Sequence, residues 1–200
     1  NTGRTRDQWH SMTRTGLSPR LGRHLAEPYL EIHPDDVRDL GLAAAGLAEV
    51  QSPKGRAVLR VMPSAAVPPG HPFAPMHWTG ETAPSGRIDR LVPGLTDPLS
   101  GQPALKAARV AIRPFSAGWF GYAVADRPFR PDCAYWARGP VSGGMQAELA
   151  GDTLPEDWVS WAGRLFGLET LPLTMADPAR GLHRLAFVQA GVIDQGDVAF

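Results

Sequence analysis

The sequence is poor in cysteine, in net charge and in long apolar runs. Its single cysteine, Cys133, excludes an internal disulfide and any iron–sulfur or metal site built from several thiolates of this chain. Acidic and basic residues balance at 20 each, so no overall field favours nucleic acid or a membrane. No apolar run approaches the roughly 20 residues of a membrane-spanning helix. We therefore expect neither a nucleic-acid partner nor a membrane partner.

Several catalytic motifs are also missing. The sequence contains no Walker loop, no Ser or Cys nucleophile elbow and no dinucleotide glycine fingerprint after a strand. The run Ser142-Gly-Gly144 has no preceding strand and no following lysine, so we interpret it as a turn. Cys133 has no obvious base beside it in the sequence, which favours a packed or incidental thiol. We predict no catalytic residue and no metal ligand in this chain.

Proline and glycine are abundant, at 20 and 22 residues. This exceeds their average usage and favours short strands with many turns. Residues 28–33 alternate as a strand does, and residues 34–41 have the proline, carboxylates and terminal glycine of a short helix. Residues 47–51 and 56–62 are strand-like runs joined by a Pro/Gly turn, which predicts a hairpin. Residues 108–112 predict a further strand. The fold class is therefore mainly β.

The composition changes after Pro114. Residues 118–136 are rich in aromatic side chains interspersed with Gly and Pro, which is typical of short strands around a small core. Residues 153–167 predict a helix that begins with the capping box Thr153-Leu-Pro-Glu156 and presents Trp158 and Trp161 on one face. An apolar run over residues 182–193 predicts a strand. We interpret residues 114–200 as a small α+β extension of unknown role.

The first sixteen residues hold three arginines, four threonines and almost no aliphatic side chains. They follow neither a helical nor a strand period, so they are not a core element. Guanidinium groups pair with phosphate through two parallel hydrogen bonds, and Gly3 lets the backbone approach a ligand closely. This stretch therefore suits a phosphorylated ligand rich in heteroatoms. The alternative is a frayed polar terminus, in which Trp9 and His10 would be out of place.

Three motifs carry a resemblance to a known family. Thr-Gly-Arg at residues 2–4 with Gln-Trp-His-Ser-Met-Thr-Arg at residues 8–14 resembles the opening of the last domain of molybdopterin oxidoreductases of the dimethyl-sulfoxide-reductase family. Pro75-Met-His-Trp78 and Asp97-Pro-x-Ser-Gly-Gln-Pro-x-x-Lys106 resemble two later motifs. Within the family, the assimilatory nitrate reductases are the most similar. The resemblance covers residues 1–106 and is thin afterwards.

The resemblance implies a fold and a set of ligand contacts. Residues 1–113 would form a double-psi β-barrel that binds molybdenum bis(molybdopterin guanine dinucleotide), with the extension after it. The implied cofactor-binding residues are Thr2, Gly3, Arg4, Trp9, His10, Ser11, Thr13, Arg14, His77, Trp78, Gln102 and Lys106. Two departures from the family stand out. Asp89 replaces a common Asn and is left out of the set, and Leu105 replaces an aromatic residue directly before Lys106.

The resemblance also implies an activity for the protein as a whole. In such an enzyme nitrate is reduced to nitrite by oxygen-atom transfer at molybdenum, and this part closes over the cofactor and is inactive alone. A 4Fe-4S cluster would belong to other domains of the parent. The implied partners are the remaining N-terminal domains and an electron donor, which could be ferredoxin, flavodoxin or an NADH-linked subunit. The assimilatory relatives imply a cytoplasmic location.

Three alternatives stay open from the sequence. The same domain could belong to another oxidoreductase of this family, such as a formate dehydrogenase. A free-standing double-psi barrel could be a non-catalytic protein-binding module, which predicts a contiguous exposed apolar patch. A small hydrolase or lyase could use His10, His77 and a carboxylate, which predicts that those side chains converge in one pocket.

Overall fold

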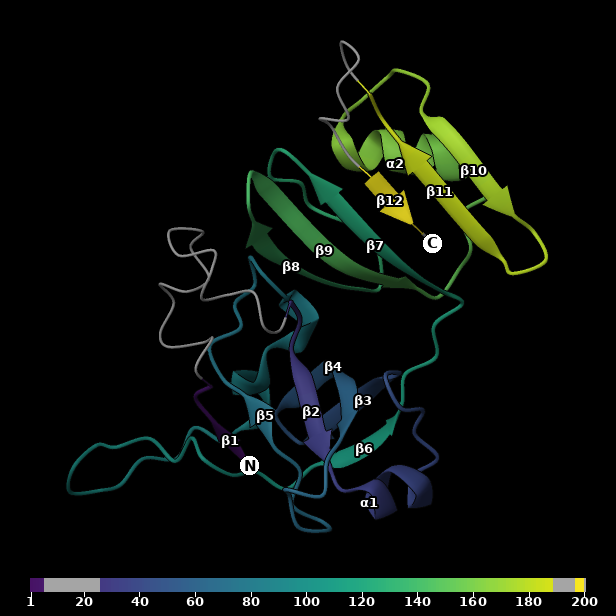
Figure 1. Ribbon diagram of the computed structural model, residues 1–200. Coiled ribbons are helices and arrows are strands. Elements are labelled where there is room, and N and C mark those ends of the chain that lie inside the picture. The colour runs from purple at the N-terminus through teal and green to yellow at the C-terminus, as the bar shows by residue number, and fades with distance from the viewer. Residues whose placement is uncertain (6–25, 189–196, 200) are drawn as a thin grey trace.

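The computed structural model describes residues 1–5, 26–188 and 197–199 (Figure 1). The fold is mainly β with little helix, as the composition predicts. In the described part of the chain the strands form a two-stranded pair, a four-stranded sheet and a six-stranded sheet. The two larger sheets lie one above the other in Figure 1. No helix among the described residues is long and apolar enough to cross a membrane.

The four-stranded sheet has the order β2-β4-β3-β6. Its strands are β2 (Tyr29–Ile32), β3 (Leu47–Ser52), β4 (Gly55–Pro63) and β6 (Ala111–Pro114). The predicted hairpin is confirmed, because β3 and β4 pair antiparallel from Leu47–Arg60 to Ser52–Gly55. β2 pairs with β4 in parallel. The closing strand was predicted too early, because β6 begins at Ala111.

The predicted double-psi barrel is not confirmed. Among the described residues, β2 and β6 are the two edges of an open sheet, so no closed barrel is found. The short strands β1 (Thr2–Gly3) and β5 (Ala74–Pro75) pair with each other and form no ladder with that sheet. Phe73, which directly precedes β5, forms an isolated antiparallel bridge with Glu31 of β2. Two 3-10 turns, η3 (Pro84–Gly86) and η4 (Ile88–Leu91), lie against β4.

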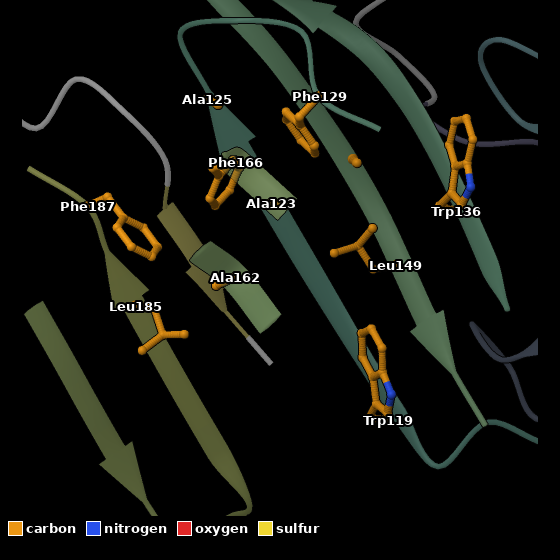
Figure 2. Close-up of a cluster of buried hydrophobic side chains, with 11 residues drawn as sticks. Trp119, Ala123, Ala125, Phe129, Trp136, Leu149, Ala162, Phe166, Leu185 and Phe187 are labelled. Atoms are coloured by element: carbon orange, nitrogen blue, oxygen red, sulfur yellow. The ribbon is translucent and has the colours of Figure 1, made fainter. Parts of the chain in front are cut away.

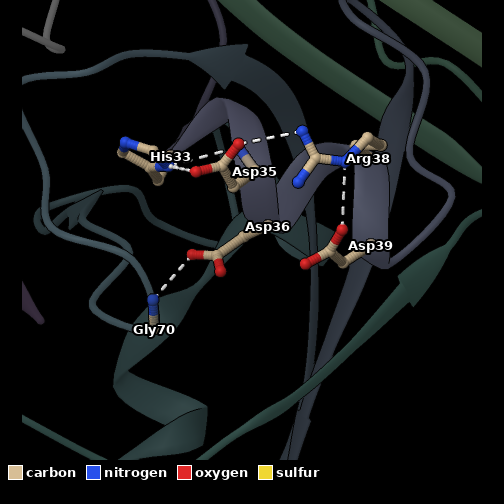
Figure 3. A network of polar contacts seen from close by, with 6 residues as sticks. All are labelled: His33, Asp35, Asp36, Arg38, Asp39 and Gly70. Carbon is tan, nitrogen blue, oxygen red and sulfur yellow. Dashed lines mark hydrogen bonds and ion pairs between the residues drawn. The ribbon is translucent and has the colours of Figure 1, made fainter.

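The predicted short helix is α1 (Pro34–Asp39), and Figure 3 shows how its charged side chains are satisfied. His33 caps it, since its Nδ1 accepts from the Asp35 N–H at 3.2 Å. Arg38 bonds Asp35 at 2.9 Å, one turn earlier. Asp36 accepts from the Gly70 N–H at 2.7 Å, which fixes the loop before β5 to the helix. These carboxylates therefore have structural partners on the helix and the adjacent loop.

The six-stranded sheet has the order β10-β11-β12-β7-β9-β8. Its pairs are antiparallel, and its strands are β7 (Trp119–Ala125), β8 (Tyr135–Val141), β9 (Gly144–Gly151), β10 (Leu173–Asp177), β11 (Leu182–Ala186) and β12 (Asp197–Ala199). The predicted strand over residues 182–193 is confirmed up to Ala186, and residues 189–193 lie outside the described part. The chain passes from one sheet to the other between Pro114 and Trp119. The division into domains 1–113 and 114–200 stays a prediction.

Helix α2 (Trp158–Phe166) covers one face of the six-stranded sheet. Figure 2 shows Ala162 and Phe166 of this helix among buried side chains of the strands, including Leu149 and Leu185. The helix begins five residues later than the predicted capping box at Thr153. Asp157 is the N-cap, since its carboxylate accepts from the Val159 N–H at 2.9 Å. The helix ends as predicted at Gly167, which has a φ of +68°.

The opposite face of the six-stranded sheet packs on the N-terminal half. Three buried side chains of β8 and β9 belong to one hydrophobic cluster with four from the N-terminal half. The seven are Tyr135, Ala137 and Ala150 with Leu47, Val58, Trp78 and Ala83. Backbone groups join the same surfaces, because the Arg138 N–H donates to the Thr82 carbonyl at 2.7 Å. The two sheets are therefore in direct contact through a packed interface.

Candidate functional site

The structure brings the starts of two sequence motifs together as a parallel strand pair. Thr2 lies opposite Ala74 and Gly3 opposite Pro75, so the opening stretch runs beside the segment that leads into His77. The Met76 N–H donates to the Gly3 carbonyl at 3.0 Å. Segments separated by about 70 residues are thus fixed in register by main-chain bonds.

The third motif reaches the same place at its last residue. The Thr2 N–H donates to the carbonyl oxygen of Lys106 at 3.0 Å. The backbones of Thr2–Gly3, Ala74–Pro75 and Lys106 therefore form one continuous hydrogen-bonded group. The side chain of Lys106 is exposed, as is that of Arg4, so two cations project from segments that this group fixes.

Two hydroxyl groups in the opening segment are unsatisfied. Among the described residues, the Thr2 and Thr5 Oγ1 atoms are buried without a hydrogen-bond partner. A buried hydroxyl that lacks a partner costs about 1–3 kcal/mol, so such groups mark places where a ligand or water completes the bonding. The two threonines flank Gly3 and Arg4. A phosphate or pterin edge offers the acceptors and donors that these hydroxyls need, so the residues present fit such a ligand.

The backbone of Gly3 lies close to the ring of Phe73. A Cβ atom on it would lie 3.2 Å from Cε2 of Phe73, tighter than ordinary van der Waals contact. A larger residue would push the opening strand away from Phe73 and strain the pairing of β1 with β5. The glycine therefore serves strand packing here, and its predicted role in ligand approach stays a prediction.

His77 and Trp78 follow β5 but differ in environment. The backbone of His77 has a φ of +78°, a left-handed conformation that is uncommon for residues other than glycine. Such strain is concentrated at functional sites. The Trp78 side chain is only 4% exposed and lies in the hydrophobic cluster between the two sheets. Its ring therefore has a packing role, and its contact with the cofactor stays a prediction.

The segment between η4 and β6 forms a loop that extends away from the four-stranded sheet (Figure 1). Gln102 and Lys106 belong to this segment. The loop is held by its own bonds. The Asp97 N–H donates to the Gln102 carbonyl at 2.8 Å, and the Asp97 carboxylate accepts from the Ser100 N–H at 2.8 Å and from its hydroxyl at 2.9 Å. The bonds from Ser100 lower the pKa of Asp97 below its ordinary value. The motif therefore presents exposed polar groups on a preformed loop.

Five of the predicted site residues lie outside the described residues: Trp9, His10, Ser11, Thr13 and Arg14. The convergence of His10, His77 and a carboxylate, which the hydrolase alternative requires, is likewise outside the described part. Thr5 is not among the predicted site residues, although its hydroxyl group directly follows Arg4 in the sequence.

Asp89 and Cys133, which are not among the predicted cofactor-binding residues, each have a partner within the protein. Asp89 forms an ion pair with Arg87, two residues earlier. The Cys133 thiol donates to the Tyr135 carbonyl at 3.1 Å, and burial raises its pKa to about 11. Such a thiol stays protonated and is a poor nucleophile. Within the described ranges, no group of three or more His, Cys, Asp and Glu residues could hold a metal ion.

Comparisons with known proteins identify relatives of this chain. It is 43% identical over 166 residues to a nitrate reductase of Klebsiella oxytoca, which covers 82% of the chain and 19% of the relative. It is 37% identical over 112 residues to a nitrate reductase of Synechocystis, covering 56% and 16%. It is 26% identical over 113 residues to the assimilatory nitrate reductase catalytic subunit of Bacillus subtilis, covering 56% and 15%. The chain thus spans between 15% and 19% of the length of these relatives.

A family profile matches the same region that carries the three motifs. The family described as the molydopterin dinucleotide binding domain matches residues 1–109. A solved structure, acetylene hydratase from Pelobacter acetylenicus, matches 57% of the chain with 22% identity and a TM-score of 0.46, which is too loose to support an argument. The profile match covers more than half of the 200 residues. The chain therefore belongs to the family of molydopterin dinucleotide binding domains.

Proposed function

We propose that this chain is the part of a molybdenum-dependent nitrate reductase that closes over bis(molybdopterin guanine dinucleotide). The observation that carries the proposal is the convergence of the three motif segments at Thr2–Gly3, Ala74–Pro75 and Lys106. The relatives whose matches cover 82% or 56% of the chain are named nitrate reductases. When bound, the cofactor supplies the molybdenum centre at which an oxygen atom leaves nitrate.

The residues of this chain would bind and orient the cofactor. Arg4 offers a guanidinium fork and Lys106 a point charge, both suited to phosphate oxygens. The hydroxyls of Thr2 and Thr5 would complete their bonding on the ligand. Trp9 and His10, from the same stretch of sequence, would add a flat apolar face and a directional hydrogen bond. In such enzymes the protein supplies orientation and electrostatics while the cofactor carries the chemistry.

The proposal includes features of the whole enzyme. A 4Fe-4S cluster in other domains would deliver electrons from a donor such as ferredoxin, flavodoxin or an NADH-linked subunit. The location would be cytoplasmic. The fold of residues 1–113 would be a double-psi β-barrel. The alternative is that the enzyme uses the same cofactor but acts on another substrate, such as formate. The assay below distinguishes these two possibilities.

The test uses the full-length parent enzyme expressed with molybdenum cofactor. Molybdenum and guanine nucleotide are measured per polypeptide in the wild type, in the double variant Arg4→Ala/His10→Ala, and in Arg180→Ala as a matched control. Arg180 is exposed on the turn between β10 and β11. We expect about one molybdenum in the wild type and the control, and a marked loss in the double variant.

Nitrate and formate are then supplied as alternative substrates to the loaded wild type. Nitrate-dependent turnover with a reduced dye supports the nitrate reductase proposal, whereas formate oxidation without nitrate turnover overturns its substrate. A wild type that contains no molybdenum under cofactor-replete expression overturns the proposal as a whole. The non-catalytic binding module would then account for the chain.

A further inference from the structure

An open groove lies between the two larger sheets. Its volume is about 1050 Å³, and its walls come from the turn before β3 (residues 43–47), the connection between the sheets (residues 114–117) and strand β7. Figure 1 shows this connection passing from β6 to β7 at the side of the two sheets. Most of the side chains in this inter-sheet groove are apolar, and its charged residues are Glu27, Arg60 and Glu148.

Strand β7 has one covered face and one uncovered face. Its side chains alternate between the two faces, and Trp119 and Ala123 pack with helix α2 in a buried cluster. Phe120 and Tyr122 point to the opposite face and line the inter-sheet groove, where they are 45% and 38% exposed. Exposed apolar side chains that lie together in a groove mark a contact surface.

These two aromatic side chains continue an interface that is already packed. Phe120 lies opposite Ala150, and Ala150 lies opposite Tyr135. Ala150 and Tyr135 are buried in the hydrophobic cluster between the two sheets. The Arg60 guanidinium lies over the Phe120 ring at 5.5 Å from its centroid, and much of the ring stays exposed. The same cross-strand row therefore passes from a covered surface on β8 and β9 to an uncovered surface on β7.

The charges of the groove do not balance. The Arg60 guanidinium bonds the Glu27 carboxylate through two hydrogen bonds, 2.7 Å from Nε and 3.0 Å from Nη2, so these two charges offset each other. Glu148 has no hydrogen-bond partner among the described residues, and burial beside Glu27 raises its pKa to about 7. When it is ionised, the groove carries one uncompensated negative charge. A half-buried carboxylate without a partner is unfavourable, so a cation that enters the groove would pair with it.

The lengths of the relatives indicate what covers this surface. The chain spans between 15% and 19% of the length of three nitrate reductases, so most of the polypeptide of such an enzyme lies outside it. The match to the Klebsiella oxytoca enzyme covers 82% of the chain, which is more than residues 1–109 can supply. The second half of the chain is therefore shared with that enzyme in part, beyond the region that the family profile matches.

We infer that the inter-sheet groove is a docking surface for another segment of the parent polypeptide, which places apolar side chains on Phe120 and Tyr122 and a lysine or arginine beside Glu148. The inference rests on the proposed function, in which this chain is one part of a longer enzyme. It gives the six-stranded sheet a role, because β7 and β9 extend the packed interface into a surface that binds the rest of the protein. A second copy of the chain and a small organic cation are the other occupants that the test separates.

The test uses the full-length enzyme, whose molybdenum content is measured in the same preparation. Hydroxyl-radical footprinting of the wild type compares Phe120 and Tyr122 with Leu171, which is 88% exposed between α2 and β10. We expect Leu171 to be modified freely and the two aromatic side chains to be strongly protected, because the docked segment covers them. Protection of this kind is not expected from the exposure of Phe120 and Tyr122 in the chain itself.

A photoreactive benzoylphenylalanine in place of Phe120 identifies the neighbour, and the same group in place of Leu171 is the matched control. We expect position 120 to cross-link within one polypeptide to a peptide outside residues 1–200 that contains a lysine or arginine. Position 171 should not cross-link to that peptide. Glu148→Gln should raise the modification rate of Phe120 by up to roughly fivefold, the factor for loss of one partly exposed ion pair. Glu156→Gln, which removes an exposed carboxylate outside the groove, should not change it.

Three results overturn the inference and leave the proposed function intact. One is free modification of Phe120 and Tyr122 in an enzyme that contains molybdenum. Another is a cross-link between two copies that is confined to the dimer fraction, which would assign the groove to a second copy. The third is protection that dialysis removes, which would assign it to a small cation. A cross-link within one polypeptide in an enzyme that contains no molybdenum would instead support the docking surface and overturn the proposed function.

Discussion

The Tyr135 hydroxyl and the Glu27 carboxylate are 108 positions apart in the chain, yet their oxygens lie 2.7 Å apart. A second carboxylate, that of Glu148 on β9, lies close enough to Glu27 for the two negative charges to repel each other. Burial and the negative charge of Glu27 raise the pKa of Glu148 to about 7, and Arg60 only partly offsets them. The interface between the sheets therefore contains a carboxyl group that takes up a proton near neutral pH.

The free energy of unfolding of the chain should depend on pH through Glu148. Its pKa is about 7 when folded and about 4.3 when unfolded, so between these values the folded state holds an extra proton. The resulting stability is complete below about pH 4 and is lost as pH rises through 7. Replacing the group by a neutral amide removes this loss. Glu148→Gln should therefore gain stability relative to wild type, on the order of 1 kcal/mol after allowance for solvent screening, as pH rises from 5 to 8.

Melting temperatures of the wild type, Glu148→Gln and Glu156→Gln at pH 5 and pH 8 test this prediction. Glu156 is exposed beside helix α2 and serves as the control. The difference between Glu148→Gln and wild type should become more positive at pH 8, while that of the control stays constant. A difference that is independent of pH for Glu148→Gln would mean that the interface does not disfavour the carboxylate.

Gly151 should be intolerant of even a methyl group. A Cβ atom there would lie 2.2 Å from Nε1 of Trp119. That indole packs edge-on against Trp158 at 5.2 Å and Trp161 at 5.4 Å, and its N–H donates to the Thr153 carbonyl at 2.9 Å. It therefore cannot move without disturbing the helix. Gly151→Ala should lower the free energy of unfolding by about 1–3 kcal/mol, a usual cost of overpacking.

Gly139→Ala is the matched control for this prediction. Gly139 lies on β8 of the same sheet, and a Cβ on it would meet no atom within 4 Å. Urea unfolding of both variants and the wild type gives the comparison. Equal midpoints for Gly151→Ala and Gly139→Ala would show that Trp119 has room to shift.

The start of helix α2 should depend on Asp157. Its carboxylate accepts from Val159 N–H and Ser160 Oγ, and these bonds hold its pKa below the ordinary value. The capping contribution is therefore present above the pKa of an unfolded aspartate and is lost as pH falls through the lowered value. Asp157→Ala should lower the melting temperature at pH 7, and the deficit should shrink in acid. Glu156→Ala, which removes the neighbouring carboxylate, should leave the melting temperature nearly unchanged at both pH values.

The sequence predicts local features well and long-range ones poorly. The hairpin of β3 and β4 follows from two strand-like runs around a Pro/Gly turn. The start of α2 was misplaced because Thr153 and Glu156 have the spacing of a capping box, while Asp157 and Ser160 form the actual cap. The bond between Tyr135 and Glu27 has no local signal at all. Only packing of one sheet on the other creates it.

The candidate site likewise combines local features that the sequence predicts with long-range contacts that it does not. Resemblance selected Thr2, His77 and Lys106, but no periodic pattern could give the parallel pairing that joins their segments. Trp78 was selected for its place in a motif, and its burial between the sheets became visible only in the structure. Burial depends on which surfaces meet, and a single sequence does not encode that in its spacing.

The two lysines of the chain give a direct test of the site. Lys106 ends the third motif, and its carbonyl accepts from Thr2 N–H. Lys54 lies in the turn between β3 and β4, and both side chains are exposed. If Lys106 contacts a phosphate of the cofactor, Lys106→Ala should reduce guanine nucleotide content severalfold in the full-length enzyme, while Lys54→Ala should not. Because both changes remove one exposed charge, an equal loss in both variants would point to overall charge, and no loss in either would remove Lys106 from the site. A loss confined to Lys106→Ala that becomes smaller at high salt identifies a charge–phosphate contact, since salt screens that contact in the wild type and brings its cofactor content towards that of the variant.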